Sequence, residues 1–297
     1  MDVFGVVAGP QQKYLRAAVV RAAGELRLWE ALPASADEAA RKLGLKSARR
    51  LRRLLDALAL FGIARREAGV FYARSHHPSA PVPDAGWGRL AEVIRTDRPV
   101  AEPGISGAGA PDELRRFHDH LFEIGAAPAR ELWAALQPEG PLLDLGGGSG
   151  AWSAAFPGEA TLADTPAVLA LSQAPRARAL ALDLLNGIYP GDQGVVLLCN
   201  VLHLFGEADC TALVAKAAGA LRPSGLLVVK DLLVEPDRAG PSEGVLFALN
   251  MALFTEAGDV HDPPTIERWL RQAGLAAPRR LLLTTSPGSL VLAAAKP

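Results

Sequence analysis

Glycines follow an acid at alternate positions in the stretch PLLDLGGGSGAWSAAF, residues 141–156. Apolar residues lead into Asp144, and small and apolar residues at helical spacing follow Gly146, Gly148 and Gly150. This pattern predicts a buried strand, a tight turn and a helix. Glycine is needed where the backbone takes a positive φ or lies against a ligand, and a helix N-terminus offers unpaired N–H groups. The stretch therefore predicts a cofactor-binding loop.

Two classes of cofactor fit this loop. Gly146, Gly148 and Ala151 match a dinucleotide fingerprint, and Asp164 lies where its ribose-binding acid is expected, which indicates a nicotinamide oxidoreductase. The carboxylate of Asp144, however, is expected at the mouth of the loop, where it would repel a pyrophosphate and attract a cationic amino-acid group. This acid with three alternate glycines resembles the cofactor loop of class I S-adenosylmethionine-dependent methyltransferases.

Polar residues also follow the other strands that the sequence predicts. Apolar runs alternate with helical segments, as in a parallel doubly wound sheet, at 142–145, 160–163, 179–182, 195–199 and 226–229. Ligands bind at the carboxyl ends of such strands. We therefore expect one crevice to be lined by Asp144, Asp164, Asp183, Asn200, His203 and Asp231. The two oxygens of Asp164 can accept from two ribose hydroxyls, and Asp183, beside apolar Leu184, can accept from an adenine amino group.

The first hundred residues form a separate part of the chain. Their helical spacings and capping signals, followed by two short strands, predict a winged-helix module. They carry 17 basic and 10 acidic residues, whereas 14 and 22 follow, which marks a boundary near residue 100. We expect a winged-helix domain at 1–100 and a catalytic domain at 101–297. Within the latter, helices in 101–140, broken or kinked near 125–128, would line the substrate pocket.

The third helix of the module carries Arg49, Arg50, Arg52 and Arg53. A basic recognition helix suits DNA, so a cofactor-sensing DNA-binding regulator is the non-enzyme alternative. We favour a solvated helix face and no nucleic-acid partner, because the acidic cofactor domain beside it has no use for DNA. No charge-free run of about 20 apolar residues occurs, so we expect no membrane partner. Cys199 and Cys210 are the only cysteines, which fits reduced thiols in the cytoplasm.

Nearly the whole chain resembles the small-molecule O-methyltransferases of the plant phenolic type, which are widespread in bacterial natural-product pathways. The matching segments are LLDLGGGSG at 142–150, ADTP at 163–166, LDLL at 182–185, VLLCNVLHLF at 196–205, LRPSGLLVVKD at 221–231 and a C-terminal hairpin turning at Pro287-Gly288. The resemblance implies a winged-helix dimerisation domain joined to a seven-stranded, doubly wound, Rossmann-like methyltransferase domain. It also implies S-adenosylmethionine as cofactor, S-adenosylhomocysteine as product, and a homodimer. The apolar positions Leu15, Val19 and Leu26 favour that dimer, since they exceed what a small module buries alone.

The expected site residues fall into two sets. The cofactor contacts are Asp144, Gly146, Gly148, Gly150, Asp164, Thr165, Asp183, Leu184, Cys199 and Asn200. The candidates for the acceptor pocket are Phe117, His120, Leu121, Asn250, Phe254 and His261. The second set is mostly apolar or aromatic, which suits a flat small molecule, aromatic or polyketide-like, that carries a hydroxyl.

The general base of the family falls on His203, and Asp231 would orient it. A phenol is a weak nucleophile until its proton is removed, and histidine is the natural base near neutral pH. Leu204 and Phe205 replace the Asp-Trp of the family, and a second orienting glutamate has no clear counterpart among residues 259–262. These departures leave C- or N-methylation, or a non-methylating member, as alternatives. His203, His261 and Asp231 also raise a metal site, but their spacing does not establish convergence, and we expect no metal.

Overall fold

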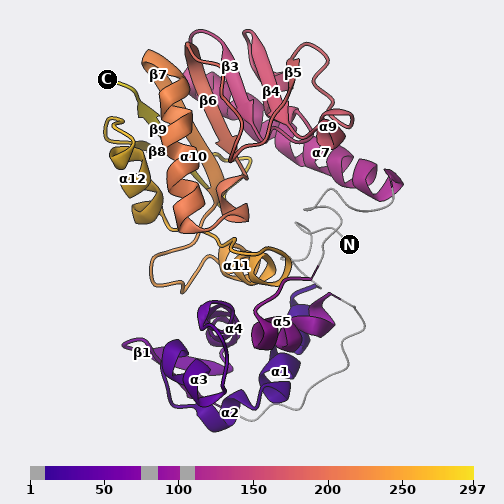
Figure 1. Cartoon of the computed structure of the whole chain (residues 1–297), viewed down its shortest axis with the longest axis vertical. Helices are drawn as coiled ribbons and strands as arrows, with labels where there is room; N and C mark the ends of the chain where they lie inside the picture. The colour runs from indigo at the N-terminus through magenta and orange to yellow at the C-terminus, as the bar shows by residue number, and fades with distance from the viewer. Residues whose placement is uncertain (1–10, 75–85, 101–110) are drawn as a thin grey trace. The chain divides into compact units, whose positions relative to one another are not determined.

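The computed structural model describes residues 11–74, 86–100 and 111–297, and the chain divides into two compact units (Figure 1). The first unit comprises Met1–Glu102 with Val234–Val260, and the second comprises Pro103–Leu233 with His261–Pro297. The division differs from the expected domains in one respect. Residues 234–260, which we expected within the catalytic domain, belong to the N-terminal unit.

The N-terminal unit contains helices and a two-stranded hairpin. Its elements up to residue 100 are α1 (Gln11–Glu25), α2 (Leu28–Ala31), α3 (Ala36–Lys42), α4 (Arg49–Leu60), β1 (Ala64–Glu67), β2 (Val70–Ala73), η2 (Trp87–Arg89) and α5 (Leu90–Thr96). Ser35 caps α3 in the predicted capping box, since its N–H donates to the Glu38 carboxylate at 2.8 Å while its hydroxyl accepts from the Glu38 N–H. Strands β1 and β2 are antiparallel. The order of helices and hairpin is the one that the sequence predicts.

The first helix does not present an apolar face to a partner. Leu15, Val19 and Leu26 are only 1%, 0% and 6% exposed, because α1 packs against α4 and α5 of the same unit. The expectation that these side chains lie on a free apolar surface is therefore wrong. They form the core of the unit, and the proposed dimer loses this support.

The segment 234–260 packs on the N-terminal unit through α11 (Ser242–Phe254), which lies against α4. Arg50 of α4 is 1% exposed, and its guanidinium donates to the backbone carbonyls of Ala252 and Thr255. The same side chain pairs with Asp97 at 2.8 Å. A buried arginine needs this full set of acceptors. Arg50 thus fixes the C-terminal end of α11 to α4.

The neighbouring arginines serve the same segment. Arg49 donates to the Glu256 carbonyl at 2.5 Å, and Arg53 pairs with Asp259 at 2.6 Å. The expectation of a solvated helix face is wrong for Arg50 and Arg53, which are both buried. Their guanidinium groups bind carbonyl and carboxylate oxygens of the chain itself, so these two side chains do not form a DNA-binding face.

The second unit is built on a seven-stranded sheet in the order β5-β4-β3-β6-β7-β9-β8. Its strands are β3 (Leu142–Leu145), β4 (Ala160–Asp164), β5 (Arg178–Ala181), β6 (Gln193–Cys199), β7 (Leu221–Leu232), β8 (Arg279–Leu281) and β9 (Ser289–Ala295). Strands β3 to β7 pair in parallel, and β9 pairs antiparallel with both β7 and β8. The predicted doubly wound sheet and its C-terminal antiparallel pair are confirmed.

Helices cover both faces of this sheet. They are α7 (Pro111–Leu136), α8 (Ala151–Ala155), α9 (Pro166–Leu169), α10 (Glu207–Ala220) and α12 (Pro263–Gln272), with the 3-10 turn η3 (Leu202–Leu204) after β6. Alternate strand residues face opposite sides. Leu143 and Leu145 pack with α10 and α12, whereas Leu142 packs with α7 and α8, and Figure 1 shows α10 crossing the near face. None of the described helices is both long and apolar enough to cross a membrane.

Of the break or kink expected near 125–128, a break does not occur, since α7 continues through Pro128. Proline removes one helical N–H and crowds the preceding turn, a cost that packing must offset. A side chain on Gly125 would come within 2.9 Å of Ala151, so glycine lets α8 approach this part of the helix. The indole of Trp133 donates to the Trp152 carbonyl at 3.0 Å. These contacts with α8 hold the helix on both sides of the proline.

Candidate active site

The glycine loop takes the conformation that its sequence predicts. Gly146, Gly148 and Gly150 have φ values of 67°, 54° and 84°, in the left-handed region that favours glycine. A Cβ atom on Gly146 would lie 2.8 Å from the Val201 side chain, and one on Gly150 would lie 2.8 Å from that of Ala174. Larger residues are thus excluded by both backbone conformation and space. The loop delivers the chain from β3 to the N-terminus of α8.

Asp164 ends β4 and binds this loop directly. Its Oδ2 accepts from the N–H of Gly148 at 3.0 Å, and its Oδ1 accepts from the N–H of Thr165 at 2.7 Å. Burial raises the pKa of this carboxyl above its ordinary value, although the two N–H groups act to lower it. A carboxylate oxygen has two lone-pair directions, so each oxygen can still accept from a ligand hydroxyl.

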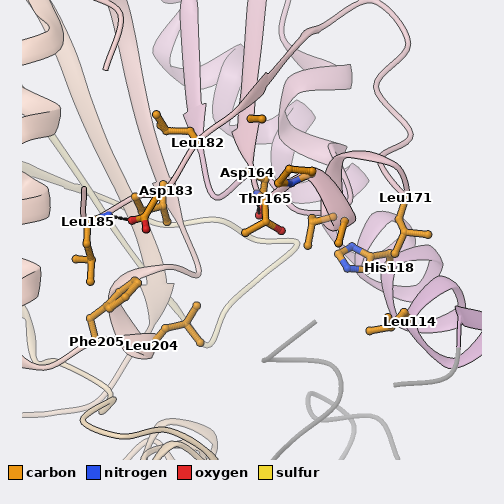
Figure 2. A pocket seen from close by; sticks show the side chains of 15 residues that line it. Leu114, His118, Asp164, Thr165, Leu171, Leu182, Asp183, Leu185, Leu204 and Phe205 are labelled. Atoms are coloured by element: carbon orange, nitrogen blue, oxygen red, sulfur yellow. Dashed lines mark hydrogen bonds between the residues drawn. The ribbon is translucent and has the colours of Figure 1, made fainter. Parts of the chain in front are cut away.

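A pocket of about 680 Å³ lies beside Asp164. Its polar lining comes from His118, Asp164, Thr165 and Asp183, and most of the remaining lining is apolar, including Leu182, Leu184, Leu204 and Phe205. Figure 2 shows Asp164 between Asp183 on one side and His118 of α7 on the other. A volume in this range and a mostly apolar wall with few polar groups are typical of small-molecule sites.

Asp183 is fixed by the turn that follows β5. Its Oδ1 accepts from the N–H groups of Leu185 and Asn186 at 2.8 and 3.0 Å, and its Oδ2 accepts from the Asn186 side-chain amide at 3.2 Å. Hydrogen bonds from the backbone and side chain of Asn186, together with that from Leu185, lower the pKa of Asp183. The carboxylate is therefore ionised at neutral pH and held rigidly at the pocket wall.

We expected the Asp144 carboxylate at the mouth of the loop, and this expectation is wrong because the side chain is buried. A Cβ on Gly147 would come within 2.9 Å of the Asp144 carboxyl carbon, so the loop itself covers the side chain, which is 0% exposed. Its Oδ2 accepts from the Ser153 hydroxyl at 2.7 Å, and its Oδ1 has no hydrogen-bond partner among the described residues. Burial raises the pKa of Asp144 to about 7. Strand β3 lies between β4 and β6, so its last residues end inside the structure.

Besides Asp144, five further predicted cofactor contacts are absent from the pocket lining: the loop glycines Gly146, Gly148 and Gly150, and also Cys199 and Asn200. Cys199 is buried at the end of β6, and burial raises the pKa of its thiol. Asn200 has a φ of 57°, its N–H donates to the Lys230 carbonyl at 2.7 Å, and its side-chain oxygen accepts from the Lys230 ammonium at 3.1 Å. In this structure Asn200 therefore binds the neighbouring strand β7.

His203 and Asp231 are brought together by the carboxyl ends of β6 and β7. The Nδ1 atom of His203 lies 2.6 Å from Asp231 Oδ1, and the His203 N–H donates to Asp231 Oδ2 at 3.2 Å. Each residue is 3% exposed. Burial alone would raise the pKa of Asp231. The positive charge of His203 and its hydrogen bond to the carboxylate lower this pKa, which lies below its ordinary value. Asp231 is thus an ionised acceptor for Nδ1–H.

The six residues predicted for the acceptor pocket lie in both units. Phe117, His120 and Leu121 are on α7, and His261 precedes α12, in the second unit. Asn250 and Phe254 are on α11 in the N-terminal unit, where the Phe254 ring packs edge-on against Trp87 with centroids 6.4 Å apart. Asn250 is 2% exposed. The Nε2 atom of His261 contacts the backbone carbonyls of Leu202, in η3, and of Phe205, directly after it, and the sequence does not predict this contact.

His118 is a pocket-lining residue that sequence reasoning missed. It is 4% exposed, and its Nδ1 has no hydrogen-bond partner among the described residues. Burial lowers the pKa of its imidazole, although Asp164 acts to raise it. Leu114 lines the same pocket four residues earlier, so the helical period of α7 carried a signal for this face. Within the described part of the chain, no group of three His, Cys, Asp or Glu side chains could hold a metal ion.

Comparison with known proteins identifies relatives of this fold. The model of the O-methyltransferase domain family matches residues 112–276. A 3-hydroxy-5-methyl-1-naphthoate 3-O-methyltransferase from Streptomyces sahachiroi is 28% identical, over 90% of this chain and 88% of its own. An acetylserotonin O-methyltransferase from Mus musculus is also 28% identical, over 81% and 76% of the two chains.

Solved structures confirm the fold. An O-methyltransferase family 2 protein from Planctomyces limnophilus, in complex with apigenin, has a TM-score of 0.73 at 22% identity, covering 100% of this chain and 97% of that one. Human N-acetylserotonin methyltransferase, in complex with S-adenosylmethionine, has a TM-score of 0.58 at 21% identity, covering 96% and 94%.

Proposed function

Because the chain belongs to the O-methyltransferase domain family, and is an S-adenosylmethionine-dependent enzyme acting on small molecules, we propose that it methylates a hydroxyl of an aromatic or polyketide-like natural product, with His203 as general base. The observation that carries this proposal is the 2.6 Å contact between His203 Nδ1 and Asp231 Oδ1. Relatives named for a hydroxynaphthoate and for tetracenomycin polyketide synthesis support this acceptor class.

The pocket beside Asp164 fits the adenosine part of the cofactor. Its volume of about 680 Å³, the glycine loop bound to Asp164 and the two fixed carboxylates all suit that group. Asp164 would accept from the ribose hydroxyls, and Asp183 would accept from the adenine amino group, with Leu184 against the adenine ring. When bound, the cofactor supplies an electrophilic methyl group on a sulfonium. Asp144, buried behind the loop, would act by holding the loop in shape.

The hydrogen bond to Asp231 determines which nitrogen of His203 is basic. With Nδ1–H donated to the ionised carboxylate, the lone pair of the neutral imidazole is at Nε2. Nε2 would take the hydroxyl proton as the acceptor oxygen bonds to the methyl carbon and the bond between that carbon and the sulfonium sulfur breaks, which would leave S-adenosylhomocysteine. Asp231 would then stabilise the imidazolium that forms. Burial of both residues keeps water away from this pair, which strengthens their interaction.

A homodimer through residues 1–100 stays a prediction, supported by the family resemblance. Leu15, Val19 and Leu26 are buried within the chain, so another surface of this part would have to form the interface. The regulator alternative loses two of the four arginines on which it rested, because Arg50 and Arg53 bind oxygens of the chain itself.

The proposed function is tested in two steps. Calorimetry should detect S-adenosylhomocysteine binding to the wild type, and Asp164→Ala should weaken it by about 1–3 kcal/mol, the size of a lost charge-assisted pair. Tritiated methyl transfer is then measured with a panel of hydroxynaphthoates and flavones, matched to the same compounds lacking the hydroxyl. We expect transfer only where the hydroxyl is present. Equal transfer to both members of a pair would indicate attack through carbon and contradict O-methylation.

A further inference from the structure

The imidazole of His261 lies against the turn that carries His203. Its Nε2 is 3.2 Å from the Leu202 carbonyl oxygen and 3.1 Å from that of Phe205. A carbonyl oxygen only accepts, so Nε2 carries a hydrogen in both the neutral and the charged imidazole. The Nε2–H group of His261 therefore contacts both Leu202, which precedes His203, and Phe205, which follows Leu204.

A second side chain donates to the same oxygens. The Sγ of Cys210, on α10, is 3.2 Å from the Leu202 carbonyl oxygen, 3.6 Å from that of Phe205 and 3.5 Å from His261 Nε2. Burial raises the pKa of this thiol, so it stays protonated and can donate, although weakly. His261 supplies the stronger of the two donors. Its loss would leave the Phe205 carbonyl with the weak thiol donor of Cys210, whereas the Leu202 carbonyl would keep the Phe205 N–H.

The position of His261 is fixed by the core. Its ring packs edge-on against Trp269, with centroids 4.8 Å apart and planes at 72°. Trp269 is 1% exposed and lies on α12, whose first turn is capped by Asp262 through the Thr265 N–H at 2.9 Å. His261 itself precedes α12, and its ring contact with Trp269 ties the donor that contacts η3 to this capped helix, as a group that orients another side chain requires.

The η3 turn positions more than one part of the site. His203 bonds to Asp231, whereas Leu204 and Phe205 line the pocket beside Asp164. The backbone of η3 has hydrogen bonds of its own, since the Phe205 N–H donates to the Leu202 carbonyl at 3.1 Å. A shift of this short turn would therefore move both the imidazole and the pocket wall.

We propose that His261 is a positioning residue, whose Nε2–H fixes η3 so that His203 meets Asp231 in the geometry for proton transfer. The inference rests on the proposed function, and it gives His261 a role different from the acceptor contact that the sequence predicts. Because Nε2 donates in either protonation state, His261 acts through its hydrogen bonds and not by exchanging a proton with the acceptor.

The test compares variants that differ in the donor. His261→Gln and His261→Met have side chains of similar length, but only glutamine keeps an N–H donor, and His261→Phe keeps the ring against Trp269 without a donor. We expect the Met and Phe variants to lower kcat by about 10- to 100-fold, the scale of a small misplacement of a reacting group. His261→Gln should recover most of that loss. Equal rates for the Gln and Met variants, when both are folded by circular dichroism, would overturn the proposal.

Two measurements separate positioning from a general loss of structure. In a His203→Ala background, adding His261→Met should lower kcat by less than a further factor of about two, because the group that His261 positions is gone. If the kcat losses of the two substitutions instead multiply, the positioning role is contradicted.

Proton NMR gives a readout that needs neither cofactor nor acceptor. The short Nδ1–H bond of His203 should give a strongly downfield resonance, absent in His203→Ala. This resonance should shift in His261→Met and keep its position in His261→Gln. If it does not move in the Met variant, the inference is overturned, and this outcome does not depend on whether the proposed acceptor class is right.

Discussion

Ser153 donates its hydroxyl hydrogen to Oδ2 of Asp144 at 2.7 Å, which joins the end of β3 to α8 across the glycine loop. The other carboxyl oxygen is buried without a partner among the described residues, and burial raises the pKa of Asp144 to about 7. The carboxyl therefore supports the loop from behind while its charge is costly to bury. A group in this situation makes the stability of the fold depend on pH.

Replacement of Asp144 by asparagine should stabilise the protein increasingly as pH rises. The folded state of the wild type binds the Asp144 proton more tightly than the unfolded state does, with a pKa of about 7 against an ordinary value of about 3.9. The wild type thus loses stability between about pH 4 and pH 7, by up to about 4 kcal/mol at 1.36 kcal/mol per pKa unit. The amide introduced by Asp144→Asn has no charge to bury and keeps an oxygen for Ser153.

Urea unfolding at pH 5 and pH 8.5 measures this effect. The gain of Asp144→Asn over the wild type should be larger at pH 8.5. Ser153→Ala is the control, because it removes the hydrogen bond and should destabilise the fold at both values. A gain from Asp144→Asn that is the same at pH 5 and pH 8.5 would mean that the carboxyl is not protonated in the folded state.

His118 should contribute to cofactor binding. Its Nδ1 is buried at the pocket wall beside Asp164 with no hydrogen-bond partner among the described residues, so a ligand hydroxyl there would satisfy it. We expect His118→Ala to weaken S-adenosylhomocysteine binding about 2- to 10-fold in calorimetry, the range of one net hydrogen bond. His120→Ala is the matched control, because His120 is on the same helix and is absent from the pocket lining.

A deoxy analogue identifies the partner of His118. If the imidazole meets a ribose hydroxyl, the 2′- or 3′-deoxy form of S-adenosylhomocysteine should bind the wild type more weakly, and His118→Ala should weaken its binding little further. The same loss for the natural and both deoxy ligands would place His118 away from the ribose.

The strand pattern of the second unit could be predicted because each strand has a local signal. Leu142–Leu145 is apolar, pairs on both sides and is followed by glycines with positive φ, so strand and turn follow from neighbouring residues. Asp164 and Asp183 could be placed in one crevice because parallel strands end at the same edge. Residues 112–136 also carry a helical signal, but the break expected near Pro128 does not occur, because contacts with α8 offset the cost of the proline.

Contacts between distant segments could not be predicted in this way. The sequence around Arg50 indicates a solvated side chain, and only its bonds to the carbonyls of Ala252 and Thr255 reveal that it anchors α11 in the N-terminal unit. The contact between His261 and η3 joins residues nearly sixty positions apart. The helical period of α7 places His118 on one face with Leu114, but nothing in the sequence indicates that this face meets Asp164. Each of these side chains is polar, and its role depends on which partner the fold brings near.

Removal of the imidazole at position 203 tests the general base. His203→Ala should lower kcat by about 10²- to 10⁴-fold, the usual contribution of positioned acid–base groups. Affinity for S-adenosylhomocysteine should barely change, because His203 is absent from the lining of the cofactor pocket. Asp231→Ala should cost less than His203→Ala, since Asp231 orients the imidazole and does not take the proton.

The choice of variants at 203 separates proton transfer from packing. His203→Gln fills a similar volume and keeps a polar end but has no basic nitrogen, so it should be as slow as His203→Ala. If both variants keep near wild-type turnover with the true acceptor, deprotonation is not part of the slow step. The enzyme would then act by proximity, or methylate carbon or nitrogen, and Leu204, which stands where the family has an acid, would be the residue to examine next. Slow variants with normal cofactor affinity would instead place His203 at the acceptor hydroxyl, as the bond to Asp231 supports.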